Sequence, residues 1–501
     1  MREKTSTRRQ FVTRLGGAAI GASVASLVDW NAESAERPNI VLILADDLGY
    51  NDVGCYGQPK IRTPRIDRLA AEGVRLTAHY SASPVCAPSR CSLLTGLHSG
   101  HAYIRDNDEM PERGDVWNDP SLEGQRPLPK GTVTIGTALK DAGYETAVIG
   151  KWGLGGPGSE GEPRRQGFDY SFGYLCQRQA HNYYPDHLWR NGERVPLDNR
   201  TFSAHQKLPA DKDPDNPRSY DAYRGHRYSF DVMLDDAVAY VGRRRSKPFF
   251  LYFTPTIPHL ALQVPEDSLA EYVGVFPETP YRGDKGYLPH RTPRAAYAAM
   301  VSRLDRGVGR LVDALTEMRL DRRTLVVFTS DNGATFATGG CDPAFFESNR
   351  PWRGAKQQLY EGGIRVPCIA LWPGRIPSGR VRDDATAGWD LFPTFAELAG
   401  ARPRERVDGV SLMPALTGGG PVRRDCLYWE FQGKQAVRLG NWKALRNARK
   451  DTMELYDLSS DPGEARNVAA DHRETASRLR RVMDAARVES ERYPLVPKPS
   501  R

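Results

Sequence analysis

Five short, uninterrupted apolar runs, separated by helix-like stretches, constrain the fold of this 501-residue chain more than any other feature. A continuous apolar run of about four to eight residues is typical of a strand that is buried on both faces. The runs are Asn39 to Leu44, Thr146 to Ile149, Pro248 to Phe253, Thr324 to Phe328 and Val366 to Leu371. The helix-like stretches between them cover 64–71, 134–142, 230–241, 295–318 and 391–398. This alternation predicts an α/β domain built on a large, mixed but mostly parallel sheet flanked by helices.

The C-terminal part of the chain has a different pattern, because short strand-like pieces follow one another with only turns between them. From about Pro421 onward, these pieces cover 426–430, 435–439, 442–446 and 453–458, and a helical segment covers 474–487. Successive short strands joined by turns favour antiparallel pairing. We therefore predict a main domain over residues 36–420 and a smaller C-terminal subdomain over 421–501, which is an antiparallel sheet packed with one helix.

The N-terminus carries a pattern typical of protein export. Thr7-Arg8-Arg9-Gln10-Phe11 contains a twin arginine, and the uncharged segment Leu15 to Val28 is rich in Gly, Ala and Ser. This segment is too short and too weakly apolar to span a bilayer, so we expect no stable membrane insertion. Residues 1–35 are therefore predicted to be a twin-arginine export signal, read by the twin-arginine translocase of a bacterium, which implies a periplasmic or secreted protein. The alternative is a disordered basic tail.

Charge and cysteine content narrow the classes of function. The net charge is +8, and such a mild positive field suits an anionic substrate. No basic run with interleaved aromatic residues occurs, so nucleic-acid binding is not expected. The seven cysteines show no compact spacing, and their odd number leaves at least one thiol without a disulfide partner.

Acidic and amide side chains follow two of the predicted strands. Asp46 and Asp47 come after the first apolar run, and Asp331 and Asn332 come after the fourth. Ligands of such sheets lie beyond the carboxyl ends of the strands. Four oxygen donors suit a hard divalent cation, which also removes the repulsion between adjacent carboxylates. The alternative is helix capping or turn formation, in which Asp and Asn are common.

Cys86 opens the unusual segment Cys86-Ala87-Pro88-Ser89-Arg90-Cys91. Four residues lie between its cysteines, so the segment is not a redox CxxC pair. The residues from Ser89 to Leu94 are predicted to form the first turns of a helix. Cys86 is therefore expected near a helix N-terminus, where anions are favoured and thiol pKa values fall. The alternative is a cysteine that only fills space in the core.

These blocks resemble a known family. Cys86-Ala87-Pro88-Ser89-Arg90, followed by Leu93-Leu94-Thr95-Gly96, resembles the signature of the type I, formylglycine-dependent sulfatases, an arylsulfatase-like family of the alkaline phosphatase-like superfamily. Further blocks resemble this family in its own order; they are Leu44–Tyr50, Gly150–Trp152, Pro258–His259, Ser330–Gly333, Arg353–Lys356, Glu361–Pro367 and Glu454–Leu458. The resemblance implies an alkaline phosphatase-like fold and a sulfatase catalytic domain over residues 36–420.

The resemblance also implies a modified nucleophile. In this family a maturation enzyme oxidises the cysteine that matches Cys86 to formylglycine, whose hydrate attacks the sulfur of a sulfate ester and later expels inorganic sulfate. Arg90 would orient this group. Lys151 and Lys356 would bind the sulfate oxygens, and His259 would protonate the leaving oxygen or bind sulfate. The implied cofactor is Ca²⁺, with the ligands Asp46, Asp47, Asp331, Asn332 and the modified Cys86.

One position departs from the family pattern. A histidine usually stands two residues after the lysine of Gly-Lys-Trp, but this chain has Gly153 there. We predict that another histidine enters the pocket, because hydrogen-bonding side chains cluster around His181, the first candidate, and His187, the second. The alternative is that their segment only packs or binds substrate.

The segment 177–184 has the mix of side chains that binds sugars. Amide and guanidinium groups pair with hydroxyls, and aromatic rings pack on sugar faces. The predicted substrate-binding residues are Gln177, Arg178, His181, Asn182, Tyr183, Tyr184, His259 and Lys356. We therefore predict a sulfated carbohydrate as natural substrate, with a galactose-type sugar indicated only by a loose resemblance, and aryl sulfates as simpler substrates. The segment 183–226, rich in Tyr, Arg, Asn, Asp and Pro, is predicted to form long surface loops.

Two other functions stay open. A phosphonate or phosphate ester hydrolase of the same superfamily would share the fold, metal and nucleophile. It would need more cations in the pocket, because its substrate carries a second negative charge. An exported sugar-binding relative without catalysis would fit the loss at Gly153, but the intact Cys86, Arg90 and Lys151 argue against it.

Overall fold

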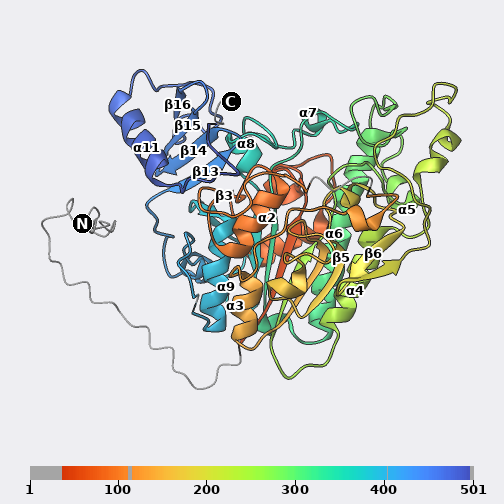
Figure 1. The fold of residues 1–501 in the computed structure, drawn as a ribbon, viewed down its shortest axis with the longest axis horizontal. Helices are drawn as coiled ribbons and strands as arrows, with labels where there is room; N and C mark the ends of the chain where they lie inside the picture. The colour runs from red at the N-terminus through yellow and green to blue at the C-terminus, as the bar shows by residue number, and fades with distance from the viewer. Residues whose placement is uncertain (1–36, 111–115, 403, 497–501) are drawn as a thin grey trace, which may run out of the picture. The chain divides into compact units, whose positions relative to one another are not determined.

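One mixed sheet lies at the centre of the computed structural model, which describes residues 37–110, 116–402 and 404–496 (Figure 1). The strand order is β11-β2-β10-β9-β1-β8-β4-β5-β6-β7. The strands are β1 (Asn39–Ala45), β2 (Val74–Leu76), β4 (Glu145–Lys151), β5 (Tyr170–Tyr174), β6 (His187–Arg190), β7 (Glu193–Pro196), β8 (Phe249–Thr254), β9 (Thr324–Ser330), β10 (Cys368–Leu371) and β11 (Arg380–Arg382). The export signal predicted over residues 1–35 lies outside the described residues.

Parallel pairing in the middle of the sheet aligns the ends of four strands. β1 lies between β8 and β9 and runs parallel to both, with Ile40 beside Phe250 on one side and Leu325 on the other. β4 is parallel to β8 on its far side. Antiparallel β10 beside β9, and the β6–β7 hairpin beside β5, make the sheet mixed. The predicted mixed, mostly parallel sheet is confirmed, and the carboxyl ends of β9, β1, β8 and β4 lie side by side.

Helices cover both faces of the sheet. The longer helices of the main domain are α1 (Pro64–Glu72), α2 (Cys86–Thr95), α3 (Ile135–Asp141), α4 (Ser229–Val241), α6 (Pro293–Glu317) and α9 (Leu391–Ala399). Val41 and Ile43 of β1 belong to a core shared with α1, α4 and α6. Ile40, Leu42 and Leu44 belong to a second core with α2, α3 and α9. Figure 1 shows α3 and α9 together on one side and α4 with α6 on the other. Because both faces of β1 are buried, all of its residues from Ile40 to Ala45 are apolar.

Shorter elements complete the main domain. They are β3 (His79–Tyr80), β12 (Thr386–Ala387), α5 (Glu266–Leu269), α7 (Pro343–Phe346), α8 (Glu361–Ile364) and α10 (Met413–Thr417). None of the helices that the structure describes between residues 37 and 496 combines the length and apolar character that a bilayer span requires.

The segment 183–226 differs in part from its prediction as surface loops, because it contains β6 and β7. These strands form an antiparallel hairpin at the edge of the sheet. Asn191 and Gly192 connect them with φ values of 55° and 88°. An Asn-Gly pair with positive φ at both residues is the strongest short-range signal for a two-residue hairpin. Composition alone did not predict the hairpin, because β7 is largely exposed and carries polar residues like those of a loop.

The C-terminal part forms the predicted antiparallel sheet with one helix. Its elements are β13 (Leu427–Phe431), β14 (Lys434–Leu439), β15 (Trp442–Asn447), β16 (Thr452–Asp457) and α11 (Arg473–Ala485), which lie together in Figure 1. Tyr428 and Val437 face α11, where they pack with Leu479. Trp429 faces the main domain and packs against Trp389. The sheet is therefore covered on both faces, and the boundary between residues 420 and 421 stays a prediction.

A buried ion cluster joins this sheet to the main domain. The Lys443 ammonium of β15 lies 2.8 Å from the Glu361 carboxylate of α8 and 2.9 Å from the Glu464 carboxylate. All three side chains have 0% exposure. Glu361 also pairs with Arg365 at 3.0 Å, so the Lys443 ammonium is the cation that the two buried carboxylates share.

We expect Lys443→Met to destabilise the protein by about 3–5 kcal/mol, because it removes the cation paired with buried Glu464 and leaves Glu361 with Arg365 alone. Lys434→Met on neighbouring β14 is the control, since Lys434 is exposed. The measurement is the urea midpoint and the thermal midpoint of the full chain. Equal midpoints for the two variants would show that Lys443 does not stabilise this contact.

Candidate active site

The candidate site lies where the central parallel strands end. Asp46 and Asp47 follow β1, Asp331 follows β9, and Lys151 is the last residue of β4. His259 follows β8 within the next five residues. All five side chains are buried, with exposures between 0% and 4%. The parallel alignment thus gathers the residues that the sequence predicted from separate strand ends.

The backbone at Asp47 turns two adjacent carboxylates into one site. Adjacent residues of a continuing strand point to opposite faces. Asp47 instead has a φ of 61°, a left-handed conformation that Asp tolerates better than most residues. The Asp46 carboxylate lies 2.7 Å from the Lys151 ammonium, and the Asp47 carboxylate lies 2.7 Å from the Lys356 ammonium. Burial would raise the pKa of Asp46, but Lys151 and the other cations outweigh it and hold this pKa well below its usual range.

Cys86 lies between these ion pairs. It is the first residue of α2, and its Sγ lies 3.5 Å from Asp46 Oδ1 and 3.4 Å from Lys356 Nζ. The helix N-terminus was expected to lower the thiol pKa, and this expectation is wrong. Burial raises the pKa of Cys86 to about 12, although Lys151 and Lys356 act in the opposite direction. Desolvation of the thiolate therefore outweighs the nearby positive charges.

Arg90 ties α2 to three strand ends. It stands one helical turn after Cys86 and has 0% exposure. Its Nη2 donates to Asp331 Oδ2 at 2.8 Å, and its Nη1 donates to the Lys151 carbonyl at 2.7 Å and to the Thr254 hydroxyl. The guanidinium therefore links β9, β4 and β8 and fixes the helix that carries Cys86. Its predicted role in orienting a modified Cys86 stays a prediction.

The acidic group has the donor chemistry of a hard-cation site. Asn332 Nδ2 donates to Asp47 Oδ1 at 2.7 Å, and Asn332 Oδ1 is buried without a hydrogen-bond partner. Burial, together with the neighbouring Asp46 charge, raises the pKa of Asp331 to about 6. Ligand atoms of Asp46, Asp47, Cys86 and His259 all lie within 4.8 Å of one another. An orphaned oxygen beside crowded carboxylates fits a Ca²⁺ ion, whose preferred ligands are oxygens.

Two histidines stack at the open side of this group. The rings of His181 and His259 are 5.0 Å apart and 18° from parallel. His259 Nδ1 donates to the Leu260 carbonyl at 2.6 Å, and its Nε2 lies 3.6 Å from Asp47. Burial lowers the pKa of His259 to about 4, and burial also lowers the pKa of His181 well below its usual value. His181, the first histidine candidate, therefore lies at the site.

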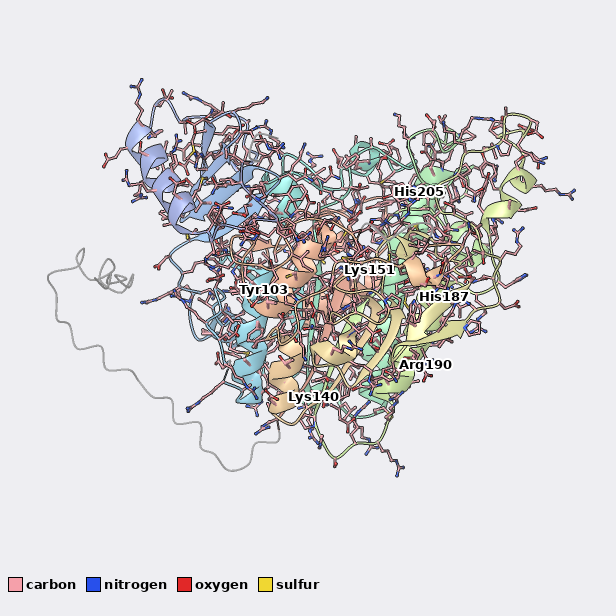
Figure 2. The ribbon with its side chains drawn as sticks, in the orientation of Figure 1. Tyr103, Lys140, Lys151, His187, Arg190 and His205 are labelled. Carbon is pink, nitrogen blue, oxygen red and sulfur yellow. The ribbon has the colours of Figure 1, made fainter. Side chains whose placement is uncertain are left out.

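His187, the second candidate, lies elsewhere. It is on β6, and it pairs with Glu123 at 2.9 Å and with Asp186 at 2.6 Å. Figure 2 shows Lys151 near the middle of the sheet and His187 farther toward its edge. His187 is therefore part of a separate group of ion-paired side chains, away from Cys86.

Gln177 fills the space that a side chain at position 153 would need. Gly153 has a φ of 74°, and a Cβ added there would lie 2.9 Å from Gln177 Cγ. The Gln177 side chain is 6% exposed, and its Oε1 has no hydrogen-bond partner. An amide therefore stands beside the position where the family has an imidazole.

A cavity of about 270 Å³ lies beside Cys86, the two lysines and the two stacked histidines. Its lining residues are Cys86, Asn107, Glu109, Lys151, Gln177, Arg178, His181, His259, Tyr287, Thr335, Phe336, Thr338, Lys356 and Gln357. Three predicted substrate-binding residues are not among them. Asn182 hydrogen-bonds to the backbone of Phe202 and Tyr184, the Tyr183 hydroxyl donates to the Thr256 carbonyl at 2.9 Å, and Tyr184 lines a different cavity.

The sequence did not predict the outer wall of the cavity. Asn107, Glu109, Tyr287, Phe336 and Gln357 come from loops far apart in the chain. Two of them have contacts that explain their place: Asn107 Oδ1 accepts from the Ala87 amide at 2.9 Å, and the Tyr287 ring lies 5.2 Å from the His181 ring. No local pattern marks the others, because only the packing of the loops brings them together.

Comparisons with known proteins agree with this geometry. A family model described as "Sulfatase" matches residues 38–401, and one described as "N-sulphoglucosamine sulphohydrolase, C-terminal" matches residues 353–489. N-acetylgalactosamine-6-sulfatase of Canis lupus familiaris is 32% identical over 93% of this chain and 83% of its own length. Arylsulfatase A of Homo sapiens is 34% identical over 87% of this chain and 84% of its own length. The chain therefore belongs to the sulfatase family and is a sulfuric ester hydrolase.

Solved structures confirm the fold. The crystal structure of Ps i-CgsB in complex with k-i-k-neocarrahexaose has a TM-score of 0.72 and 28% identity, with 90% of this chain and 92% of that chain covered. The phosphonate monoester hydrolase of Agrobacterium radiobacter has a TM-score of 0.64 at 20% identity, with 92% of this chain and 100% of that chain covered. The second likeness shows a shared fold alone. The predicted alkaline phosphatase-like architecture is thus confirmed.

We expect Gly153→Ala to destabilise the protein more than Gly158→Ala. Both glycines have a φ of 74°, so each alanine carries a similar backbone strain of about 1 kcal/mol. Only at Gly153 would the new Cβ also meet Gln177, and such overpacking adds about 1–3 kcal/mol, whereas nothing lies within 4 Å at Gly158. The thermal midpoints of the two variants test this difference. Equal midpoints would mean that Gln177 moves aside freely.

Proposed function

We propose that this sulfatase is calcium- and formylglycine-dependent and hydrolyses sulfate esters of carbohydrates with release of inorganic sulfate. The observation that carries the proposal is the position of Cys86, which is buried between Lys356 and Asp46 at the carboxyl end of the sheet. A cysteine that only fills space in the core would not need two lysines and an acidic group around it.

Support for a carbohydrate substrate comes from the relatives and from the cavity. Two of the similar proteins are named for a sugar sulfate or solved with an oligosaccharide, the N-acetylgalactosamine-6-sulfatase and the complex with k-i-k-neocarrahexaose. Amide side chains line the cavity beside the lysines, which is the chemistry that hydroxyl groups require. The similarity to arylsulfatase A supports aryl sulfates as simpler substrates.

The side chains of this chain suit in-line attack on a sulfate ester. Formylglycine at position 86 would supply a hydrated aldehyde as nucleophile, which a maturation enzyme must first produce. Lys151 and Lys356 line the cavity and would bind the sulfate oxygens, where negative charge grows during the reaction. Arg90 would hold α2, and with it position 86, in register with the strand ends.

His259 is proposed to give a proton to the leaving oxygen. Its Nδ1 is held by the Leu260 carbonyl, so the ring is fixed with Nε2 toward Asp47 and the cavity. Burial keeps the free ring neutral, and a bound sulfate would favour the protonated ring by its negative charge. His181 stacks on this ring and would keep water and solvent ions from its open face.

Asp46, Asp47, Asp331 and Asn332 are proposed to hold Ca²⁺, with position 86 completing the ligand set. The bound ion would polarise the sulfate group. The orphaned Asn332 oxygen and the crowded carboxylates support this assignment.

The sequence features outside the site complete the proposal. We propose export through the twin-arginine translocase to a periplasmic or secreted location, with residues 1–35 as signal. Residues 36–420 would be the catalytic domain and 421–501 the C-terminal subdomain. Since this export route carries folded proteins, the modification of Cys86 would precede export.

Mass spectrometry of protein from its own host tests the nucleophile. We expect the tryptic peptide Leu76 to Arg90 to carry formylglycine in place of Cys86, and the same protein to release sulfate from 4-nitrophenyl sulfate. Cys86→Ala should lose this activity while it keeps its thermal midpoint. An unmodified thiol in an active preparation contradicts the proposal, and faster turnover of 4-nitrophenyl phosphate would favour a phosphate ester hydrolase instead.

Calcium binding is tested by stability as well as by activity. Ca²⁺ added to chelator-treated protein should stabilise it, by about 2.7 kcal/mol when the ion is at 100 times its Kd, because the ion binds only the folded state. Asp331→Asn should reduce this stabilisation. Asp408→Asn should keep it, since Asp408 pairs with His101 outside the site. A thermal midpoint that does not respond to Ca²⁺ in the wild-type protein would rule out the site.

A further inference from the structure

We propose that the cavity binds a second anionic group of the substrate through Arg178, beside the sulfate ester that is cleaved. The substrate is then a sulfated sugar that carries a carboxylate or a further sulfate on the same or the adjoining ring. This inference rests on the proposed function and deepens it, because it names the chemistry that sets substrate preference.

Arg178 is held in place but has no counter-ion among the described residues. Its guanidinium lines the cavity and lies 4.9 Å from the ring centroid of Trp117, which is 6% exposed. Among the residues that the structure describes, none makes an ion pair or hydrogen bond with this guanidinium, and its Nε is buried without a partner. Stacking on the indole therefore fixes the orientation of a planar cation while its donors stay open.

The other cavity cations have carboxylate partners. Lys151 lies 2.7 Å from Asp46, and Lys356 lies 2.7 Å from Asp47. Both lysines are thus matched within the machinery around Cys86. Glu109 is a further carboxylate on the cavity wall, and its charge opposes an incoming anion. The preference for an anion therefore depends on direct contact with Arg178 and not on the overall field of the cavity.

Gln177 adds an acceptor next to this cation. Its side chain is 94% buried, and its Oε1 lines the same cavity without a hydrogen-bond partner. The backbone amide of Gln177 donates to Gln125 Oε1 at 3.0 Å, which fixes the segment. An unpaired acceptor suits a sugar hydroxyl, whereas the guanidinium fork suits the two oxygens of a carboxylate or sulfate.

The size of the cavity limits where the second anion lies. At about 270 Å³ it is near the lower end of ligand pockets, which run from roughly 300 to 1,000 Å³. Because Arg178 and the Cys86 group line this one small space, both anions must lie within about one sugar ring of each other.

Matched pairs of sulfated disaccharides test the inference. One pair compares a uronate-containing disaccharide with its carboxyl-reduced form, and the other compares a disulfated disaccharide with its monosulfated form. We expect the wild-type enzyme to prefer the more anionic member of at least one pair by about tenfold in kcat/KM, the size of one charge-assisted contact. The pair that shows the preference identifies the anion as carboxylate or sulfate.

Two variants separate the role of Arg178 from a general loss of charge. Arg178→Gln should abolish the preference by lowering kcat/KM for the more anionic disaccharide by about tenfold, while kcat/KM for the less anionic member of the same pair changes less. Arg190→Gln is the matched control. Arg190, the last residue of β6, also stacks on an aromatic ring, Phe172, but it pairs with Asp236 of α4 and does not line the cavity (Figure 2).

Binding measurements keep the outcome independent of turnover. Calorimetry of the full-length Cys86→Ala protein, with and without Arg178→Gln, should show the same preference for the anionic members. Turnover without any anion preference, a preference that survives Arg178→Gln, or no binding by any disaccharide would overturn the inference. No sulfate release from any substrate, with the binding preference intact, would instead reject the proposed function and leave the inference standing.

Discussion

Charge compensation at the carboxyl edge of β9, β1, β8 and β4 is the constraint on which the rest of the structure depends. Asp46, Asp47 and Lys151 are almost fully buried there, and so is Lys356. A charge taken out of water is destabilising by several kcal/mol unless a partner of opposite sign is close. Parallel pairing ends these strands side by side, so each carboxylate meets an ammonium. The same arrangement brings two carboxylates and two ammonium groups together beside Cys86.

Arg90 shows how the helix that carries Cys86 is coupled to this edge. Its guanidinium reaches Asp331, the Lys151 carbonyl and the Thr254 hydroxyl, and each of these belongs to a different strand end. Cys86 and Arg90 are one helical turn apart in α2, so the contacts that hold the Arg90 guanidinium also fix the position of Cys86. Burial of a thiol at this place raises its pKa, so the unmodified side chain is held protonated.

Sequence reasoning succeeded where a single strand or motif carried the signal. Asp46, Lys151 and Asp331 could be placed because each follows an apolar run, and parallel strands in such a sheet end at the same edge. It failed where the signal lay in contacts between distant segments. Asn182 resembled a sugar ligand, but it hydrogen-bonds to the backbone of Phe202, twenty residues farther along the chain, and of Tyr184. His187 lay in an equally polar segment, but its partners Glu123 and Asp186 hold it at the sheet edge.

The amino-acid sequence was enough to predict the central sheet, its two helical layers, the C-terminal antiparallel sheet and the sulfatase class. Apolar periodicity and the order of motifs are local properties of a chain, so they can be recognised without its tertiary structure. Only the tertiary structure decided how the cavity is completed. Gln177 occupies the space beside Gly153, and Arg178 lies on Trp117 with no carboxylate partner in the described part of the chain. These contacts join residues that lie 24 and 61 positions apart in the chain. Long-range packing of this kind depends on how the loops close over the sheet, which no local pattern specifies.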